Sequence, residues 1–453
     1  MRGGRAMEKR TLTAAQILKF LIPSLLGACL FLIPMKIGGK YVLGVSLLCD
    51  VIQQWMTPVV DQLSLLFLGV AAVVPIIVKV AKPKLVSGHK TLRSLFDVSP
   101  VIMGVRIIGF VYVVCYLFQV GPEFIWNSAT GGEAYYIVTT ILTLMVGTCF
   151  LISLLTDFGI MDYVGILVRS LMRPLFTLPG RASLDCIASW VGSSLTGALL
   201  TSGQYKDGYY TKREACVIMT CFSTAAFSFI FILARTCGLE EYFLPAVLAI
   251  YAAVIPCAII LPRVYPLNKA KDEYAEGTTE IKEEVPQNIG KARWALECAV
   301  DRAAEMSVGK FLIKGVQSIC SVWFDVLPMV MFVACTGMIV NEYTPIFKIL
   351  TMPFVPVLNL MGFAEAEAAA PMLLTGFLDQ FLPIAMAGSI TSISTRFFIF
   401  CMAIAQIIYL SEIGVMMLRS KVDFNLGKIL LVFLERTVIS MPIIWAMTML
   451  LIH

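Results

Sequence analysis

One apolar unit that carries scattered polar residues occurs twice in this chain, about 180 residues apart. Its first copy reads MRPLFTLPGRASLDCIASWVGSSLTGALL at 172–200, and its second reads TMPFVPVLNLMGFAEAEAAAPMLLTGFL at 351–378. In this alignment Thr196 falls on Thr375. Two copies of one membrane unit in opposite orientations build a site between them, near the middle of the bilayer. The repeat therefore predicts the architecture of a secondary transporter.

The chain is apolar enough to require a lipid environment. Apolar residues make up 58% of it and charged residues only 14%, with a mean hydropathy of +0.85. A spanning helix needs about 20 mainly apolar residues. The predicted fold is therefore all-α: a multi-pass protein of the cell membrane, with two re-entrant helical hairpins in two inverted repeats. Its transmembrane helices number about nine, at 15–35, 56–78, 101–119, 136–156, 214–236, 241–262, 323–341, 396–417 and 428–451.

Lys and Arg in the short connections predict the orientation, because basic residues stay on the cytoplasmic side. Basic residues at 2–10 and at 79–93 place the N-terminus and the second connection in the cytoplasm. The connection at 119–133 contains neither Lys nor Arg and is expected outside. Basic residues flank the first polar unit, whereas the second has only Lys348 and Arg396. The two units therefore face opposite sides, and the C-terminus is expected outside.

Four segments follow from this interpretation. Residues 1–133 form a scaffold of membrane helices, and 134–262 form the first repeat. Residues 263–322 form a cytoplasmic linker with an amphipathic segment, and 323–453 form the second repeat. The stretch 263–310 mixes both signs of charge without apolar periodicity, which is typical of a solvated linker. A regulatory role for this linker is left open.

The polar part of the first copy, residues 183–204, is too short to cross the membrane twice and too polar to face lipid. Backbone that leaves helical pairing at membrane depth occurs only where protein or an aqueous cavity satisfies it. A helical hairpin that enters the bilayer and returns is therefore expected. The alternative is that its small residues only allow close helix packing. On the first reading, the solute-binding candidates are Ser193, Ser194, Thr196 and Gln204.

The second copy carries residues that are costlier to bury, namely Glu365, Glu367 and Asp379. Carboxylates within a bilayer mark ion or solute paths more often than packing. Glu367, Asp379 and the nearby Thr375 are therefore candidates, although Glu365 and Glu367 could equally lie in water at the start of the hairpin. Polar residues in the helix after each hairpin extend the predicted site: Ser228 in the first half, and Gln406, Ser411 and Glu412 in the second.

Other charges in the apolar segments are expected to be structural. Arg436 and Glu435 in the last span would pair with each other or extend to the interface. Asp325 begins the seventh span. Asp61 in the second span is interpreted as a buried acid without an assigned role.

Several function classes are disfavoured by composition. The chain has only two His, its 13 Cys are dispersed without a CxxC pair, and no phosphate-binding loop occurs. An enzyme is therefore not expected, nor is a cofactor, and metal ligands are not assigned. The net charge of +5 is small and comes from clusters beside apolar runs, which argues against nucleic acid as a partner.

Blocks of sequence along nearly the whole chain resemble the YjiH-type membrane proteins, which contain nucleoside-transporter and FeoB Gate-type (nucleoside recognition) domains. These blocks are WVGSSLTGALLTSGQYKDGYYTKREA, CFSTAAFSF, LLTGFLDQFLPIAMAGSI, TRFFIF, QIIYLSEIG and FLERTVISMPII. The resemblance implies that each copy consists of an interfacial helix, a re-entrant hairpin and following helices, as in concentrative nucleoside transporters. The ferrous-iron permease shares the Gate label, but its GTPase part is absent from this chain.

The leading hypothesis is a secondary active transporter of a small polar solute, coupled to Na+ or H+ and working by alternating access. A nucleoside, an amino acid, a small peptide and an organic cation are all compatible with the candidate residues. The alternatives are a permease for ferrous iron or another divalent metal, and, in a different class, a membrane sensor or intramembrane enzyme. The expected partners are the solute, the coupling ion and the lipid bilayer, and a homo-oligomer is left open.

Overall fold

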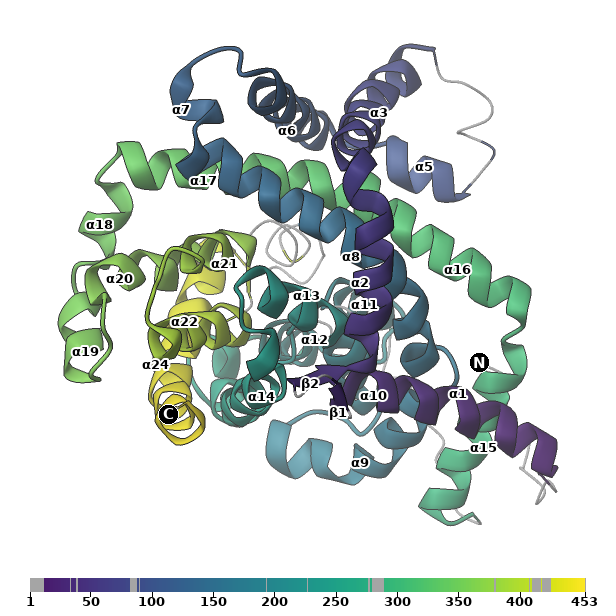
Figure 1. Cartoon of the computed structure of the whole chain (residues 1–453). Coiled ribbons are helices and arrows are strands. Elements are labelled where there is room, and N and C mark those ends of the chain that lie inside the picture. Colours follow the sequence, from purple (N-terminus) through teal and green to yellow (C-terminus); the bar gives the residue numbers. More distant parts are fainter. Residues whose placement is uncertain are drawn as a thin grey trace.

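The protein is described by a computed structural model, and helices form nearly all of its regular structure (Figure 1). One β-hairpin pairs β1 (Pro34–Ile37) antiparallel with β2 (Lys40–Leu43). Among the described residues, seven helical segments are long and apolar enough to cross a membrane. The predicted helical, multi-pass membrane fold is therefore confirmed, with this hairpin as an addition. The description covers residues 12–452 except 33, 38–39, 82–87, 89, 193, 226, 276–277, 279–288, 379, 407, 410–416 and 418–424.

The N-terminal helices pack around the outside of the two repeats. In Figure 1, α3, α5 and α6 lie together at one end of the molecule. Helices α1 and α2 both contact α8. Ser99 accepts a hydrogen bond from the Ile102 N–H and Pro100 opens the first turn, so α6 begins at a well-formed cap. The helices of this segment are α1 (Ala14–Leu32), α2 (Gly44–Met56), α3 (Val60–Ala81), α5 (Lys90–Phe96), α6 (Pro100–Phe118) and α7 (Glu123–Trp126).

Two predicted structural acids have partners in this region. Asp325 forms an ion pair with Arg106 of α6, whose side chain is only 1% exposed. Asp61 is exposed, contrary to the prediction that it is buried, and its carboxylate accepts a hydrogen bond of 2.7 Å from the Tyr135 hydroxyl. Both acids therefore hold an outer helix against the core.

The two predicted repeats each begin and end with a long helix and differ in the shorter helices between them, and they lie side by side in Figure 1. Helix α8 contacts its counterpart α17, and α14 contacts its counterpart α24. The first repeat comprises α8 (Glu133–Thr156), α9 (Ile160–Phe176), α10 (Ala182–Ile187), a π-helix (Ala188–Gly192), α11 (Ser194–Lys206), α12 (Lys212–Cys221), α13 (Phe227–Thr236) and α14 (Phe243–Ile260). The second comprises α17 (Leu327–Tyr343), α18 (Ile346–Thr351), α19 (Phe354–Leu360), α20 (Ala366–Thr375), α21 (Phe381–Ala387), α22 (Ile393–Ala405) and α24 (Leu426–Leu451).

The predicted span at 214–236 is not one continuous helix. Helix α12 starts from a capping box between Thr211 and Glu214, but it ends at Cys221, and α13 begins only at Phe227. In the second repeat α22 likewise ends at Ala405. Hydropathy alone did not reveal the first interruption, because the apolar run continues through it.

The predicted linker at 263–310 is also more ordered than expected. Helix α15 (Lys291–Glu305) packs against α9 and α1 and buries Ala295, Ala299 and Ala303. Helix α16 (Val308–Ser321) then continues through a π-helical turn (Val322–Val326) into α17, which forms the long rod across Figure 1. Alanine contributes little to an apolar pattern, which explains why the sequence suggested a solvated segment.

Candidate functional site

The first polar segment folds as two antiparallel helical arms that meet near residue 193. Ser189 of the π-helix faces Gly197 of α11, and Asp185 of α10 faces Thr201 of α11. An added Cβ at Gly197 would lie 1.7 Å from the Ser189 Oγ, so only glycine allows the arms to approach this closely. Both pairs are centred on position 193, as expected when two helical arms run antiparallel from one turn.

Polar side chains tie the two arms together at the base of this hairpin. The carboxylate of Asp185 is 1% exposed and accepts hydrogen bonds from Gln204 Nε2 at 2.7 Å and from Thr201 Oγ1 at 3.2 Å. The amide oxygen of Gln204 accepts a further bond from Arg181, whose guanidinium lies 3.7 Å from the centre of the Tyr209 ring. Gln204, a predicted solute ligand, is thus bonded at both ends of its amide within the hairpin.

The second polar segment forms the arms α20 and α21, which contact each other. Its base is closed by Glu365, whose carboxylate accepts hydrogen bonds of 3.0 Å from the backbone N–H groups of Thr391 and Ser392. These N–H groups, that of Ser392 first, hold the pKa of Glu365 below its ordinary value. Glu365 therefore fixes the ends of the hairpin rather than lining its tip.

The structure changes the register in which the two copies are compared. Thr196 lies just after the turn, at the start of the second arm α11, whereas Thr375 is the last residue of the first arm α20. The alignment of these two threonines in the sequence is therefore not a structural equivalence. Thr375 is buried, and its hydroxyl donates to the Met372 carbonyl at 3.2 Å.

The interrupted helices of the two repeats meet at Arg436 of α24, which is 0% exposed. Its Nη1 and Nη2 donate to the carbonyls of Thr220 and Ser223, at 2.6 and 3.0 Å, where α12 ends. Its Nε donates to the carbonyl of Ala405, the last residue of α22, at 2.9 Å. Arg436 was expected to pair with Glu435 or extend to the interface, and this contact with both repeats was not predicted. Its partners are backbone groups, which no side-chain pattern reveals.

Gln406, the residue after α22, is a predicted ligand that the structure does place at this junction. Its Nε2 donates to the Leu373 carbonyl of the second hairpin at 3.1 Å and to Thr437 Oγ1 of α24 at 2.7 Å. Its Oε1 is buried, has no hydrogen-bond partner among the described residues, and faces Gly376 near the turn. A buried acceptor without a partner is a place where a solute or water can bind.

Aromatic contacts join the residues beside each hairpin turn to α12 and α13. Trp190, close to the first turn, packs 5.4 Å from the ring of Phe222 at the end of α12. Phe381, which follows the second turn, packs edge to face at 5.2 Å against Phe229 of α13. The indole Nε1 of Trp190 is also buried, and within the described part of the chain it has no hydrogen-bond partner. We call the region formed by both turns, the ends of α12 and α22, and Arg436 the central junction.

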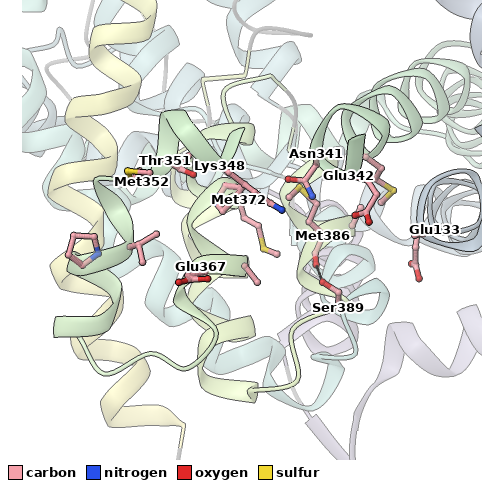
Figure 2. A pocket seen from close by; sticks show the side chains of 17 residues that line it. Glu133, Asn341, Glu342, Lys348, Thr351, Met352, Glu367, Met372, Met386 and Ser389 are labelled. Carbon is pink, nitrogen blue, oxygen red and sulfur yellow. Dashed lines mark hydrogen bonds between the residues drawn. The ribbon is translucent and has the colours of Figure 1, made fainter. Parts of the chain in front are cut away.

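A cavity of about 830 Å³ lies beside the second hairpin (Figure 2). Helices α17, α18, α20 and α21 surround it, and Figure 2 shows Glu367 on one wall with Asn341 and Glu342 on another. Four methionines also line it: Met338, Met352, Met372 and Met386. Glu367, a predicted ligand, thus lies in a cavity that has both charged and apolar walls, outside the central junction.

The remaining predicted ligands cannot be located by side chain. Ser193, Asp379, Ser411 and Glu412 lie outside the described residues. Ser194 and Thr196 belong to α11 and Ser228 belongs to α13, but their side chains lie outside the described part. Within the described part of the chain, no group of three or more His, Cys, Asp or Glu residues could hold a metal ion.

Comparison with known proteins identifies a close relative along nearly the whole chain. The protein BpOF4_10220 of Alkalihalophilus pseudofirmus is 42% identical over 442 residues, which cover 96% of this chain and 95% of that protein. The chain belongs to the BpOF4_10220 family. In this family member, residues 138–240 match the Gate model, which is described as nucleoside recognition.

The Gate match runs from α8 through the first hairpin to the residues just after α13. It confirms the predicted Gate-type domain over residues 138–240. Two solved structures of CNTnw, one outward-facing and one inward-facing with substrate bound, are similar to this BpOF4_10220 family member at 15% identity and a TM-score of 0.46. They cover 89% and 96% of this chain, respectively, and each is covered to 99%.

Proposed function

We propose that this member of the BpOF4_10220 family is a secondary active transporter of a small polar solute, coupled to Na+ or H+. The observation that carries the proposal is the central junction. Two interrupted helices and two hairpin turns, one of each from either repeat, converge there beside the partnerless acceptor Gln406 Oε1. Carriers built from such repeats bind their solute at this position and open alternately to the two sides.

The solute is proposed to contact Gln406 and the polar residues near both hairpin turns, including Ser193, Ser194, Thr196, Thr375 and Asp379. Nucleosides are the first solutes to test, because the matching domain model is described as nucleoside recognition. Amino acids, small peptides and organic cations are to be tested alongside them. The cavity beside Glu367 is proposed as the outer approach, with the N-terminus in the cytoplasm and the C-terminus outside.

Uptake into proteoliposomes tests this proposal. A solute should accumulate only when a Na+ gradient or a pH gradient is imposed. Gradient-independent flux of ferrous iron or another divalent metal, without solute uptake, would instead support a metal permease and overturn the proposal. Absence of any flux together with solute-dependent signalling would support a sensor.

A matched pair of variants tests the central junction itself. Gln406→Ala removes the amide that joins the second hairpin to α24. We therefore expect solute binding to weaken, and solute uptake to fall by at least the same factor. Gln317→Ala removes an exposed amide of α16, which bonds only Thr91 at 3.3 Å among the contacts described, and should leave uptake unchanged. Equal uptake by wild type and a folded Gln406→Ala variant would remove Gln406 from the proposed site.

A further inference from the structure

We propose that Arg436 is a built-in cation for the two interrupted helices, and that its guanidinium occupies the place where a separate inorganic cation would otherwise bind. The inference does not depend on whether the chain transports a solute. It concerns which group donates hydrogen bonds to the backbone carbonyls where α12 and α22 end.

The first step is the geometry of the donors. The last carbonyl groups of a helix have no partner within that helix. Arg436 donates to one such group in each helix, the carbonyls of Thr220 in α12 and Ala405 in α22, and to the carbonyl of Ser223, two residues beyond the end of α12. A planar guanidinium is suited to this task, because its donors point in fixed and divergent directions.

The second step is charge. The C-terminal end of a helix carries a partial charge of about −0.5. Two such ends together amount to about one negative charge, which a single guanidinium neutralises. Arg436 is 0% exposed, so water does not screen this interaction. The charge of Arg436 and the dipoles of both helices therefore compensate each other inside the protein.

The third step is a comparison with carriers of similar design. In transporters with broken helices, unwound carbonyls and the C-terminal ends of half-helices coordinate the coupling Na+ or H+. In this chain the corresponding carbonyls are already bonded to Arg436. Any inorganic cation that this protein uses must therefore bind elsewhere, and the junction itself holds a cation that cannot leave.

Chemical rescue tests this inference on the purified full-length protein. Arg436→Ala should lower the apparent melting temperature, and low millimolar guanidinium should restore part of the loss by binding at the vacated carbonyls. Urea, a neutral molecule of nearly the same shape, and choline, a cation without N–H donors, should restore nothing. Equal responses to guanidinium, urea and choline would overturn the proposal.

A matched control separates this role from ordinary helix capping. Arg263 donates to the carbonyls of Leu175 and Pro174 near the end of α9, at 2.7 and 3.0 Å, but it is exposed. Water can replace an exposed guanidinium, so Arg263→Ala should change the melting temperature little and should show no guanidinium rescue. Rescue of Arg263→Ala to the same extent as Arg436→Ala would contradict the proposed special role of Arg436.

If Arg436→Ala does not fold, a second pair of variants tests whether the charge of Arg436 stabilises the central junction. Arg436→Lys keeps a cation near the same carbonyls, whereas Arg436→Met keeps a side chain of similar length without charge. The proposal requires Arg436→Lys to melt at a higher temperature, or to give more folded protein, than Arg436→Met. If Arg436→Met equals or exceeds Arg436→Lys, the residue fills space and the proposal fails.

Discussion

Gly197 in the second arm of the first hairpin packs directly against Ser189 in the first arm. A Cβ at Gly197 would lie 1.7 Å from the Ser189 Oγ and 2.8 Å from its Cβ. The hairpin is therefore held together at a contact that leaves no room for any other side chain. Its polar composition, which suggested a solute site, also reflects this close packing.

Gly197→Ala should destabilise the protein, because the arms must separate to admit the methyl group. Overpacking of this kind costs about 1 to 3 kcal/mol. The control is Gly203→Ala in the same helix, where an added Cβ meets nothing within 4 Å. There alanine should be neutral or stabilising by up to about 1 kcal/mol through helix propensity. Thermal melting of both variants checks the prediction, and equal behaviour of the two would contradict it.

The hydrogen bonds that Glu365 accepts from the Thr391 and Ser392 N–H groups predict that the stability of the protein depends on pH. The pKa of Glu365 is lowered in the folded state, so its contribution is fully present above the ordinary value of 4.5 and disappears as the pH falls through the folded-state pKa. Wild type should therefore melt at a higher temperature than Glu365→Gln at neutral pH, and the two should converge in acid. A difference that stays constant across this range would show that the charge is not involved.

The ion pair between Arg106 and Asp325 predicts an asymmetry between one substitution and two. Asp325→Leu leaves the buried guanidinium of Arg106 without its carboxylate but with its bond to the Leu95 carbonyl, which should cost about 1 to 3 kcal/mol. Arg106→Leu together with Asp325→Leu should recover much of this loss. Asp97→Leu, which breaks an exposed pair with Arg93, should cost no more than about 1 kcal/mol. Melting curves of the three variants measure these differences, and a double variant that melts no higher than Asp325→Leu would contradict the coupling.

The contact between α9 and α15 predicts that one substitution can detach α15 from α9. Gly159 has a φ of +101°, and a Cβ there would lie 2.3 Å from the Ala299 carbonyl oxygen. Gly159→Ala should loosen α15 and increase its cleavage by trypsin in limited proteolysis. Gly290→Ala, at the start of α15 with no neighbour within 4 Å, should digest like wild type. Identical digestion of all three proteins would contradict the prediction.

The sequence predicted those features that depend on residue type along the chain. The concentration of Ser, Thr and Gly at 183–204 indicated the first polar hairpin. Gln406 was expected inside a continuous span at 396–417, whereas it lies directly after the end of α22. The sequence did not predict contacts that depend on backbone geometry. The interruption after Cys221 lies in an apolar run, and the carbonyls that Arg436 binds lie in helices that are distant from it in the sequence.

The packing of α15 was missed for a related reason. Three of its five buried residues are Ala295, Ala299 and Ala303, which contribute little to any hydropathy pattern among the surrounding charges. The register of the second hairpin was predicted wrongly because the alignment matched Thr196-Gly197 with Thr375-Gly376. In the structure, these two pairs lie on different sides of their turns. Small residues thus determine much of this fold at sites where sequence patterns carry the least information.

The position of Arg436 limits how this protein can move. Pulling α12 away from α22 would strip a guanidinium of its acceptors in a water-free interior, which is strongly unfavourable. These two half-helices and α24 should therefore travel as one block. Access from one side of the membrane or the other would then require the hairpin arms, or the block as a whole, to shift against the long rod formed by α16 and α17.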